Sequence, residues 1–164
     1  MKKIFLSIVT AAVLLLLNGC AKIQSKDEFY STEQIKSDKS VLMSVNCSEI
    51  LKNMDSLNSA LEEYIPEYGL IIEDKAYPIK EGDTVYDLLI RVAKENQIQI
   101  ESKGFSGNRE IEGINYIYNS SCGKGSRWIY KVNGEIQQPV CSDYKLKDGD
   151  IVQWIYVCND KRSD

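Results

Sequence analysis

The sequence predicts an α+β domain in which one main helix packs on a mixed sheet of about five strands. Several segments between residues 41 and 158 alternate apolar and polar residues, which is the period of a half-buried strand. Residues 85–93 instead repeat apolar side chains at helical spacing. Long apolar runs at 41–47 and 151–158 begin and end this region, as expected of strands that are buried on both faces.

The first 19 residues predict a signal peptide. Lys2 and Lys3 precede an apolar run at 4–17, which is shorter than the ~20 residues that a membrane-spanning helix needs. The following Leu-Asn-Gly-Cys resembles the bacterial lipobox, in which the cysteine, here Cys20, is lipidated and becomes the mature N-terminus. A plain secretory leader with an incidental cysteine and an N-terminal membrane anchor are the alternatives.

Residues 20–40 then predict the lipidated cysteine and a flexible tether, because they are polar, charged and poor in apolar side chains. Residues 159–164 predict a polar tail. Acyl chains on Cys20 would hold the protein on the membrane through buried CH₂ groups. We therefore expect a lipid-anchored protein on the extracytoplasmic face of the cell membrane, with its folded domain at 41–158.

The domain starts with a strand at 41–47, followed by a short helical insertion that Ser48 caps. Apolar residues recur in that insertion at Ile50, Met54, Leu57 and Leu61. Residues 70–72 form a short extended segment. A second strand follows at 76–80, and Pro78 confines it to an edge or an end of the sheet.

The main helix begins after Thr84, which forms a capping-box pair with Asp87, and Asn96 marks its end. Its apolar stripe consists of Val85, Leu88, Leu89, Val92 and Ala93.

Further strands are predicted at 98–103 and 110–114, and 116–118 continues toward an aromatic hairpin. In that hairpin Trp128, Tyr130 and Val132 alternate with Ile129 and Lys131, and Asn-Gly at 133–134 predicts a type I′ turn. The last strand is at 151–158. If the first and last strands are parallel neighbours in the centre of the sheet, the arrangement is β-grasp-like.

Composition excludes several classes of function. The chain has no histidine, which removes Ser-His-Asp and Cys-His catalysis and histidine-bound metals. Its net charge of −4 argues against binding nucleic acid. We expect neither an enzyme nor a resident cofactor.

Four cysteines remain beyond Cys20, and an even number in an exported chain predicts disulfides. Of the three possible connectivities, the β-grasp arrangement favours Cys47–Cys158, because both residues end central strands. Cys122–Cys141 would then close a loop over the hairpin. A thiolate metal site and a redox pair are the alternatives, but the sequence has no C-x-x-C.

Three segments carry a family resemblance: GDTVYDLL at 82–89, WIYKVNG at 128–134 and YKLKDGDIVQW at 144–154. Together they resemble bacterial extracytoplasmic domains similar to the C-terminal domain of transcobalamin and intrinsic factor, which are β-grasp relatives of the soluble-ligand-binding group. The resemblance covers about 41–158. It implies a non-catalytic binding module, and for the vertebrate relatives the ligand is cobalamin. Arg127 replaces a usual glycine, and no histidine is present to bind cobalt.

We expect the ligand-binding residues to be Trp128, Tyr130, Tyr118, Tyr116 and Arg127, whereas Trp154 is assigned to the core. The predicted function is capture of a small molecule, cobalamin or another corrinoid, for delivery to an uptake transporter. The alternative is an envelope adhesion or scaffolding module that binds glycan or protein through the same aromatic surface.

Overall fold

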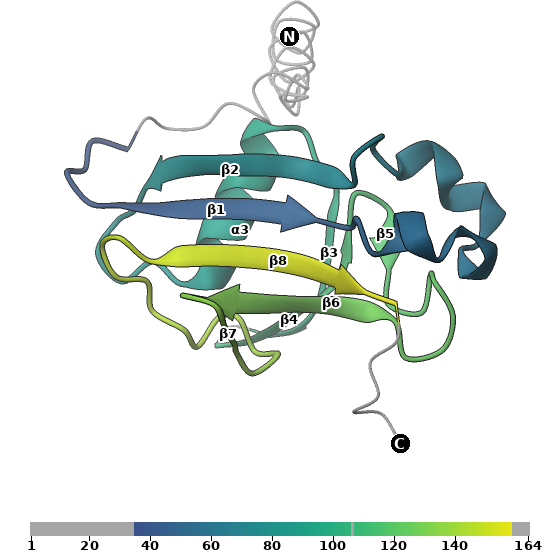
Figure 1. Ribbon diagram of the computed structural model, residues 1–164. Coiled ribbons are helices and arrows are strands. Elements are labelled where there is room, and N and C mark those ends of the chain that lie inside the picture. The colour runs from purple at the N-terminus through teal and green to yellow at the C-terminus, as the bar shows by residue number, and fades with distance from the viewer. Residues whose placement is uncertain (1–34, 106, 159–164) are drawn as a thin grey trace, which may run out of the picture. The chain divides into compact units, whose positions relative to one another are not determined.

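The computed structural model describes residues 35–105 and 107–158. They form a mixed α+β fold, mostly strands, with two sheets and few helices (Figure 1). The predicted signal peptide, Cys20, the first part of the tether and the tail at 159–164 lie outside the described residues. The strands are β1 (Ser40–Asn46), β2 (Leu70–Pro78), β3 (Ile100–Phe105), β4 (Asn108–Ile114), β5 (Ile117–Tyr118), β6 (Arg127–Val132), β7 (Glu135–Ile136) and β8 (Ile151–Val157).

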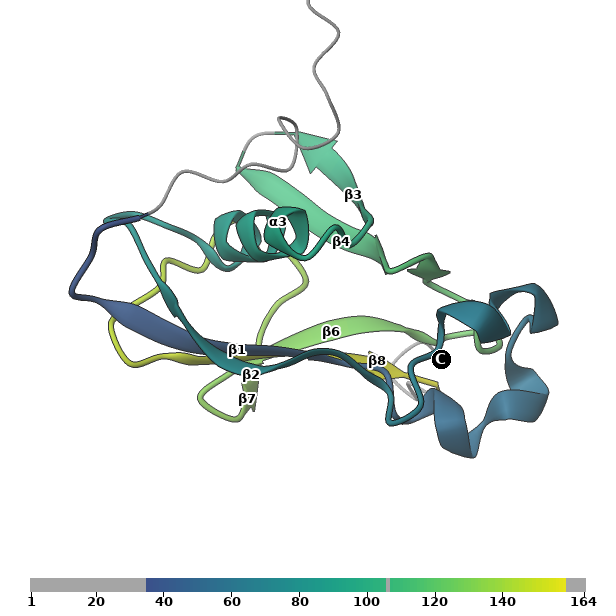
Figure 2. The ribbon, with the colours of Figure 1, turned by 90° about the horizontal axis from the view of Figure 1, so that it is seen from above.

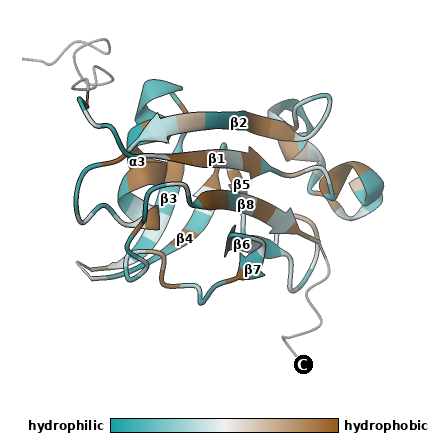
Figure 3. Cartoon of the chain, turned by 60° about the vertical axis from the view of Figure 1, so that its left-hand side comes forward, coloured by the Kyte–Doolittle hydropathy of each residue, from teal (hydrophilic) through white to brown (hydrophobic). Residues whose placement is uncertain are grey.

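The larger sheet has the strand order β2-β1-β8-β6-β7. β1 and β8 pair in parallel, with Val45 opposite Trp154, and every other pair in this sheet is antiparallel. The predicted placement of the first and last strands as parallel neighbours in the sheet centre is therefore confirmed. Both strands are largely hydrophobic, as Figure 3 shows, but the predicted burial on both faces is wrong for β8. Its inward residues are buried, whereas Ile151 is 42% exposed and the other outward residues are partly exposed.

The smaller sheet has the order β3-β4-β5, and it lies with helix α3 (Val85–Glu95) on one face of the larger sheet (Figure 2). The prediction of a single sheet of about five strands was therefore incomplete. Alternation of apolar and polar residues shows that a segment is a strand, but it does not show which other strand that segment pairs with. The core fills the space between the two layers.

Helix α3 matches its prediction closely. The Thr84 side chain accepts a hydrogen bond from the Asp87 backbone N–H at 3.2 Å, and Asp87 Oδ2 accepts one from Thr84 N–H at 2.9 Å. This capping box satisfies two backbone donors at the start of the helix. Asn96 is the C-cap, and the apolar stripe predicted from the sequence is buried throughout.

The insertion after β1 is helical, but it consists of three 3₁₀ helices: η1 (Ile50–Lys52), η2 (Met54–Ser56) and η3 (Ser59–Tyr64). Asn53 and Leu57 leave the helical conformation between them, so a continuous α-helix does not form. The two extended segments predicted at 70–72 and 76–80 form one strand, β2. It lies at the sheet edge and ends at Pro78, as the missing N–H of proline requires.

The β6–β7 hairpin turns at Asn133 and Gly134, whose φ angles are 52° and 85°, as a type I′ turn requires. Asn133 does more than turn the chain. Its Nδ2 donates to Asp150 Oδ1 at 2.9 Å, and its Oδ1 accepts from Ile151 N–H at 2.9 Å. The side chain therefore fastens the hairpin to the start of β8.

All four cysteines of the domain are buried free thiols, so the predicted disulfides are not present in the structure. Cys122 donates to Asn53 O at 3.5 Å and Cys141 donates to Arg109 O at 3.3 Å, which places these two sulfur atoms in different parts of the core. The pairing Cys122–Cys141 is therefore wrong. Cys122 instead hydrogen-bonds to Cys158, with Cys47 as a further neighbour of Cys158.

Burial keeps these thiols protonated. It raises the pKa of Cys47 and of Cys141 to about 12. Burial, followed by the hydrogen bond with Cys122, raises the pKa of Cys158 as well. Because the thiolate is the nucleophile, thiols with raised pKa values are weakly reactive near neutral pH.

A buried hydroxyl organises the loop between β5 and β6. Tyr156 is fully buried, and its hydroxyl donates to Tyr118 O at 2.7 Å. The same oxygen lies 2.8 Å from Ser126 Oγ and accepts from Cys122 N–H at 3.3 Å. One side chain of β8 therefore holds both ends of the loop.

Replacing Tyr156 with phenylalanine removes this hydroxyl and its hydrogen bond to the Tyr118 carbonyl, which still accepts from Ser121 N–H at 3.1 Å. We expect Tyr156→Phe to lower the free energy of unfolding by about 0.5–1.5 kcal/mol, the usual net contribution of one hydrogen bond. Urea denaturation measures the change. The matched control is Tyr68→Phe, since Tyr68 is 72% exposed and should change stability by less than about 0.5 kcal/mol. Equal stabilities for the two variants would contradict this role of Tyr156.

Candidate functional site

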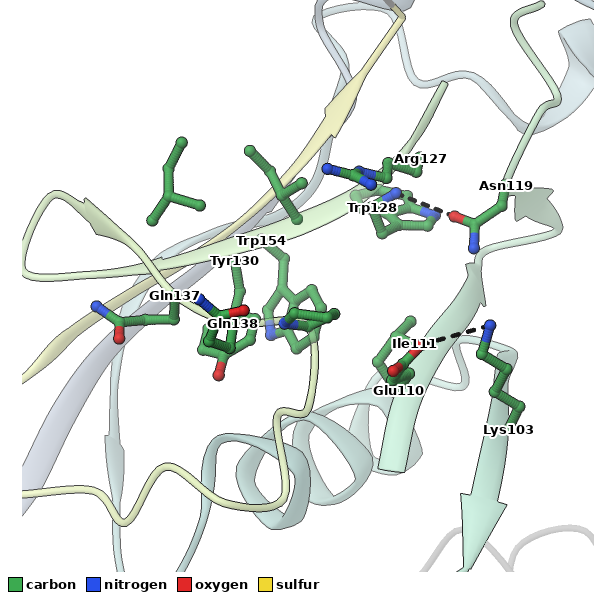
Figure 4. Close-up of a pocket in the computed structure, with 13 residues that line it drawn as sticks. Lys103, Glu110, Ile111, Asn119, Arg127, Trp128, Tyr130, Gln137, Gln138 and Trp154 are labelled. Carbon is green, nitrogen blue, oxygen red and sulfur yellow. Dashed lines mark hydrogen bonds and ion pairs between the residues drawn. The ribbon is translucent and has the colours of Figure 1, made fainter. Parts of the chain in front are cut away.

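A pocket of about 360 Å³ opens between β6 and β4, beside the segment that follows β7 (Figure 4). Its lining combines large aromatic rings with amide and charged side chains, which is the composition typical of small-molecule sites. The lining residues are Lys103, Glu110, Ile111, Asn119, Arg127, Trp128, Ile129, Tyr130, Ile136, Gln137, Gln138, Pro139 and Trp154.

Three aromatic side chains form one wall of the pocket. Trp128 and Tyr130 come from the buried face of β6, and Trp154 comes from β8, where it is paired with Tyr130. The rings of Tyr130 and Trp154 are 5.1 Å apart between centroids and tilted by 37°, a favourable arrangement for aromatic pairs. All three residues are at most 5% exposed, so they belong to the core as well as to the pocket.

The polar atoms of these three aromatic residues differ in their partners. Trp128 Nε1 donates to Ile117 O at 2.8 Å, and the Tyr130 hydroxyl donates to Val140 O at 3.4 Å. Burial raises the pKa of Tyr130, so its phenol stays neutral and remains a donor. Trp154 Nε1 is buried and has no acceptor within the described residues.

Charged residues lie at the opposite side of the pocket, on β3 and β4. Lys103 Nζ is 3.4 Å from Glu110 Oε2 and 3.3 Å from Glu112 Oε1. The hydrogen bonds that Lys103 donates to Glu112 and Glu110 raise the pKa of Lys103 and keep it charged. This cluster is partly exposed, so its ion pairs contribute little to stability.

Backbone contacts hold the remaining parts of the lining in place. Asn119 Oδ1 accepts from Trp128 N–H at 3.2 Å, which attaches the β5–β6 loop to the open edge of β6. Gln137 N–H donates to Tyr130 O at 3.1 Å and continues the hairpin beyond β7. Asn119 is therefore fastened to β6 by its side chain, and Gln137 by its backbone.

The five predicted ligand-binding residues separate into two groups. Trp128, Tyr130 and Arg127 line the pocket. Tyr116 and Tyr118 do not line it; they are 44% and 37% exposed. Tyr116 packs against Tyr64 with ring centroids 4.6 Å apart, and its φ of 64° turns the chain between β4 and β5.

Sequence reasoning placed Trp154 in the core, which is correct, but missed that it also lines the pocket. It also missed the residues contributed by β3, β4 and the loops: Lys103, Glu110, Asn119, Gln137 and Gln138. No local pattern marks these residues, because the pairing of β3 with β4 in a separate sheet brings them together.

The described ranges, 35–105 and 107–158, contain no group of three or more cysteine or acidic side chains that could hold a metal ion. No helix within these ranges is long and apolar enough to cross a membrane.

Comparison with known proteins finds similarity to a family and to solved structures. A family described as "Domain of unknown function (DUF4430)" matches residues 82–157, a range that contains every residue lining the pocket. A crystal structure of a "putative metal binding protein" from Ruminococcus gnavus ATCC 29149 is similar at 13% identity and a TM-score of 0.42, covering 73% of this chain and 97% of that one. A search of curated proteins found no match.

The double role of Trp128 leads to a prediction. Trp128→Ala removes a side chain that is 5% exposed and leaves a cavity, so we expect a loss of about 3–5 kcal/mol in the free energy of unfolding. Chemical denaturation measures this loss. Ile136→Ala is the control, because Ile136 also lines the pocket but is 45% exposed and should cost less than about 1 kcal/mol. A Trp128→Ala variant as stable as the parent would show that Trp128 is not part of the core.

Proposed function

We propose that this protein is a non-catalytic binding module that holds a small molecule in the pocket between β6 and β4. The observation that carries the proposal is the pocket itself: a wall of three aromatic rings that includes a buried donor without an acceptor in the described residues. Apolar walls with a few placed polar groups are the usual composition of ligand sites. A volume of about 360 Å³ suits a small ligand, or one part of a larger one.

A β-grasp arrangement is the finer fold that we propose. It is supported by the central parallel pair β1 and β8, with α3 and the smaller sheet on one face of the larger sheet. In this arrangement β6 lies beside β8 and presents its aromatic face toward β4, which is where the pocket is found.

A corrinoid such as cobalamin is the specific ligand that we propose, on the basis of the sequence resemblance. A corrinoid is much larger than the pocket, so the pocket would enclose one substituent or one edge of the ring. The amide side chains Asn119, Gln137 and Gln138 offer hydrogen bonds of the kind that the carboxamides of a corrinoid accept and donate. Without histidine in the chain, contacts of shape and hydrogen bonding would hold the ligand.

Calorimetric titration of the full chain in detergent against cyanocobalamin and cobinamide tests the proposal. We expect saturable binding at micromolar affinity or better. Gln138→Trp, which adds bulk at an exposed residue of the pocket lining, should weaken binding at least about tenfold, or 1.4 kcal/mol. Tyr116→Ala, outside the pocket, is the control and should bind as the parent does. No heat with either ligand from folded protein would reject the corrinoid.

A second candidate function is an envelope adhesion or scaffolding module, and one observation favours it. Tyr116 and Tyr118 are exposed, and Tyr64 packs against Tyr116, so three tyrosines gather outside the pocket. Such a surface suits a glycan or a protein partner. Loss of the partner in Tyr116→Ala, with pocket variants unaffected, would favour this function.

We also propose that Cys20 is lipidated and anchors the protein on the extracytoplasmic face, from which a captured ligand passes to an uptake transporter. The support is the signal-like segment and the lipobox-like residues that precede Cys20. Cell fractionation tests this: the parent should be in the membrane fraction, and Cys20→Ser should lose the mass of the lipid and the modified mature N-terminus. Membrane-bound parent protein without added lipid mass would contradict lipidation.

A further inference from the structure

Three of the four buried cysteines lie together at one end of the larger sheet. Cys158 directly follows β8, and its thiol is hydrogen-bonded to that of Cys122, which lies in the β5–β6 loop. Cys47, which directly follows β1, is a further neighbour of Cys158. Cys141 lies elsewhere, since its thiol donates to Arg109 O. The fold therefore brings two thiols from distant parts of the chain into direct contact.

Backbone contacts independently place Cys122 beside the end of β8. The antiparallel register of β6 with β8, extended by one residue beyond its last pair, places Ser126 opposite Cys158. Ser126 Oγ accepts from Cys122 N–H at 3.0 Å, and the Tyr156 hydroxyl accepts from the same N–H at 3.3 Å. The contact between the two thiols is therefore fixed by the fold on both sides.

Cys47 is less well placed to pair with Cys158. The parallel register of β1 with β8 pairs Asn46 with Ile155. Continued by one residue, it places Cys47 beside Tyr156, which precedes Cys158 by two residues. The Cα atoms of such a diagonal pair are about 8 Å apart, from the usual strand spacing and rise per residue. A disulfide needs a Cα separation of about 4.4–6.8 Å, so the register favours Cys122 as the partner of Cys158.

We propose that Cys122 and Cys158 are a disulfide-forming pair, joined by a disulfide oxidant while the chain folds and retained in the core as a cross-link. One thiolate attacks a sulfur of the oxidant, breaks its S–S bond and releases the first thiol. The second thiolate attacks the resulting mixed disulfide, closes the new S–S bond and releases the second thiol. Two electrons and the two cysteine protons pass to the oxidant.

Burial explains why the bond forms during folding. Cys122 and Cys158 are each only 2% exposed in the folded domain, and burial raises the pKa of Cys158. Oxidants therefore react with these thiols mainly before the core closes, when the thiols are accessible and their pKa values are near about 8.5. The same burial then shields the finished bond from reductants. An exported chain, which the sequence predicts, meets the oxidising conditions that such bonds require.

The cross-link has a defined structural effect. It fastens the β5–β6 loop, which carries Asn119 of the pocket lining, to the end of the central strand β8. Because it closes a long stretch of chain, it restricts mainly the unfolded state. We therefore expect an oxidised domain that is more stable than the reduced one, whatever ligand the pocket takes.

Peptide mapping of the refolded protein tests the pairing. The reduced full chain is refolded in detergent with oxidised and reduced glutathione, and N-ethylmaleimide in denaturant then blocks every free thiol. Trypsin cuts after lysine and arginine, so the five cysteines fall on five different peptides and each link is identified by its mass. We expect Cys122 linked to Cys158, with maleimide on Cys47 and Cys141. Cys47 linked to Cys158, or folded protein without a link between Cys122 and Cys158, would overturn the proposal.

Cys122→Ala and Cys47→Ala form a matched pair, since both remove a buried thiol beside Cys158. Each variant is denatured with urea after glutathione refolding, with and without a phosphine reductant, so the cost of the lost side chain cancels within each comparison. We expect oxidation to raise the urea midpoint of the parent and of Cys47→Ala by about 1–3 M, and to leave that of Cys122→Ala unchanged. Equal gains in all three proteins would overturn the assignment. The peptide map of the parent decides the pairing if neither variant folds.

Discussion

The parallel pairing of β1 with β8 is the constraint on which the rest of the domain depends. It joins segments about 110 residues apart in the chain and places both in the middle of the larger sheet. β8 lies between β1 and β6, and α3 and the smaller sheet cover the inward face of this sheet, so its inward residues Val152, Trp154 and Tyr156 are all buried. Two of these three then serve further purposes: Tyr156 orders a loop and Trp154 lines the pocket.

The pocket exists because β4 does not join the larger sheet. β7 pairs only with Lys131 and Val132, so the first part of β6 has no strand on its outer side. β4 pairs with β3 and β5 instead and faces β6 across the core. The space between them is closed by Asn119, which the Tyr156 network holds near the edge, and by the segment after β7.

Aromatic residues on β6 and β8 therefore belong to the core and to the pocket together. Trp128 shows the structural side of this arrangement, since its indole donates to Ile117 and supports β5. Trp154 differs, since its Nε1 is buried and has no acceptor among the described residues, while its ring lines the pocket. Exposure alone does not separate the two roles, because both residues are nearly fully buried. The two residues differ in the hydrogen-bond partners of their indole nitrogens.

The sequence by itself determined the elements whose signals are local. The capping box of Thr84 and Asp87, the apolar stripe of α3, the Asn133–Gly134 turn and the alternation in β6 and β8 each depend on residues a few positions apart. The tertiary structure alone decided which strands share a sheet, where Cys122 and Cys141 lie, and which aromatic residues reach the pocket. Tyr116 and Tyr118 are aromatic like Trp128 and Tyr130, yet they lie outside the pocket, Tyr118 on β5 of the smaller sheet and Tyr116 in the turn before it. The physical reason is that strand pairing depends on contacts between distant segments, and alternation along one strand carries no information about its partner.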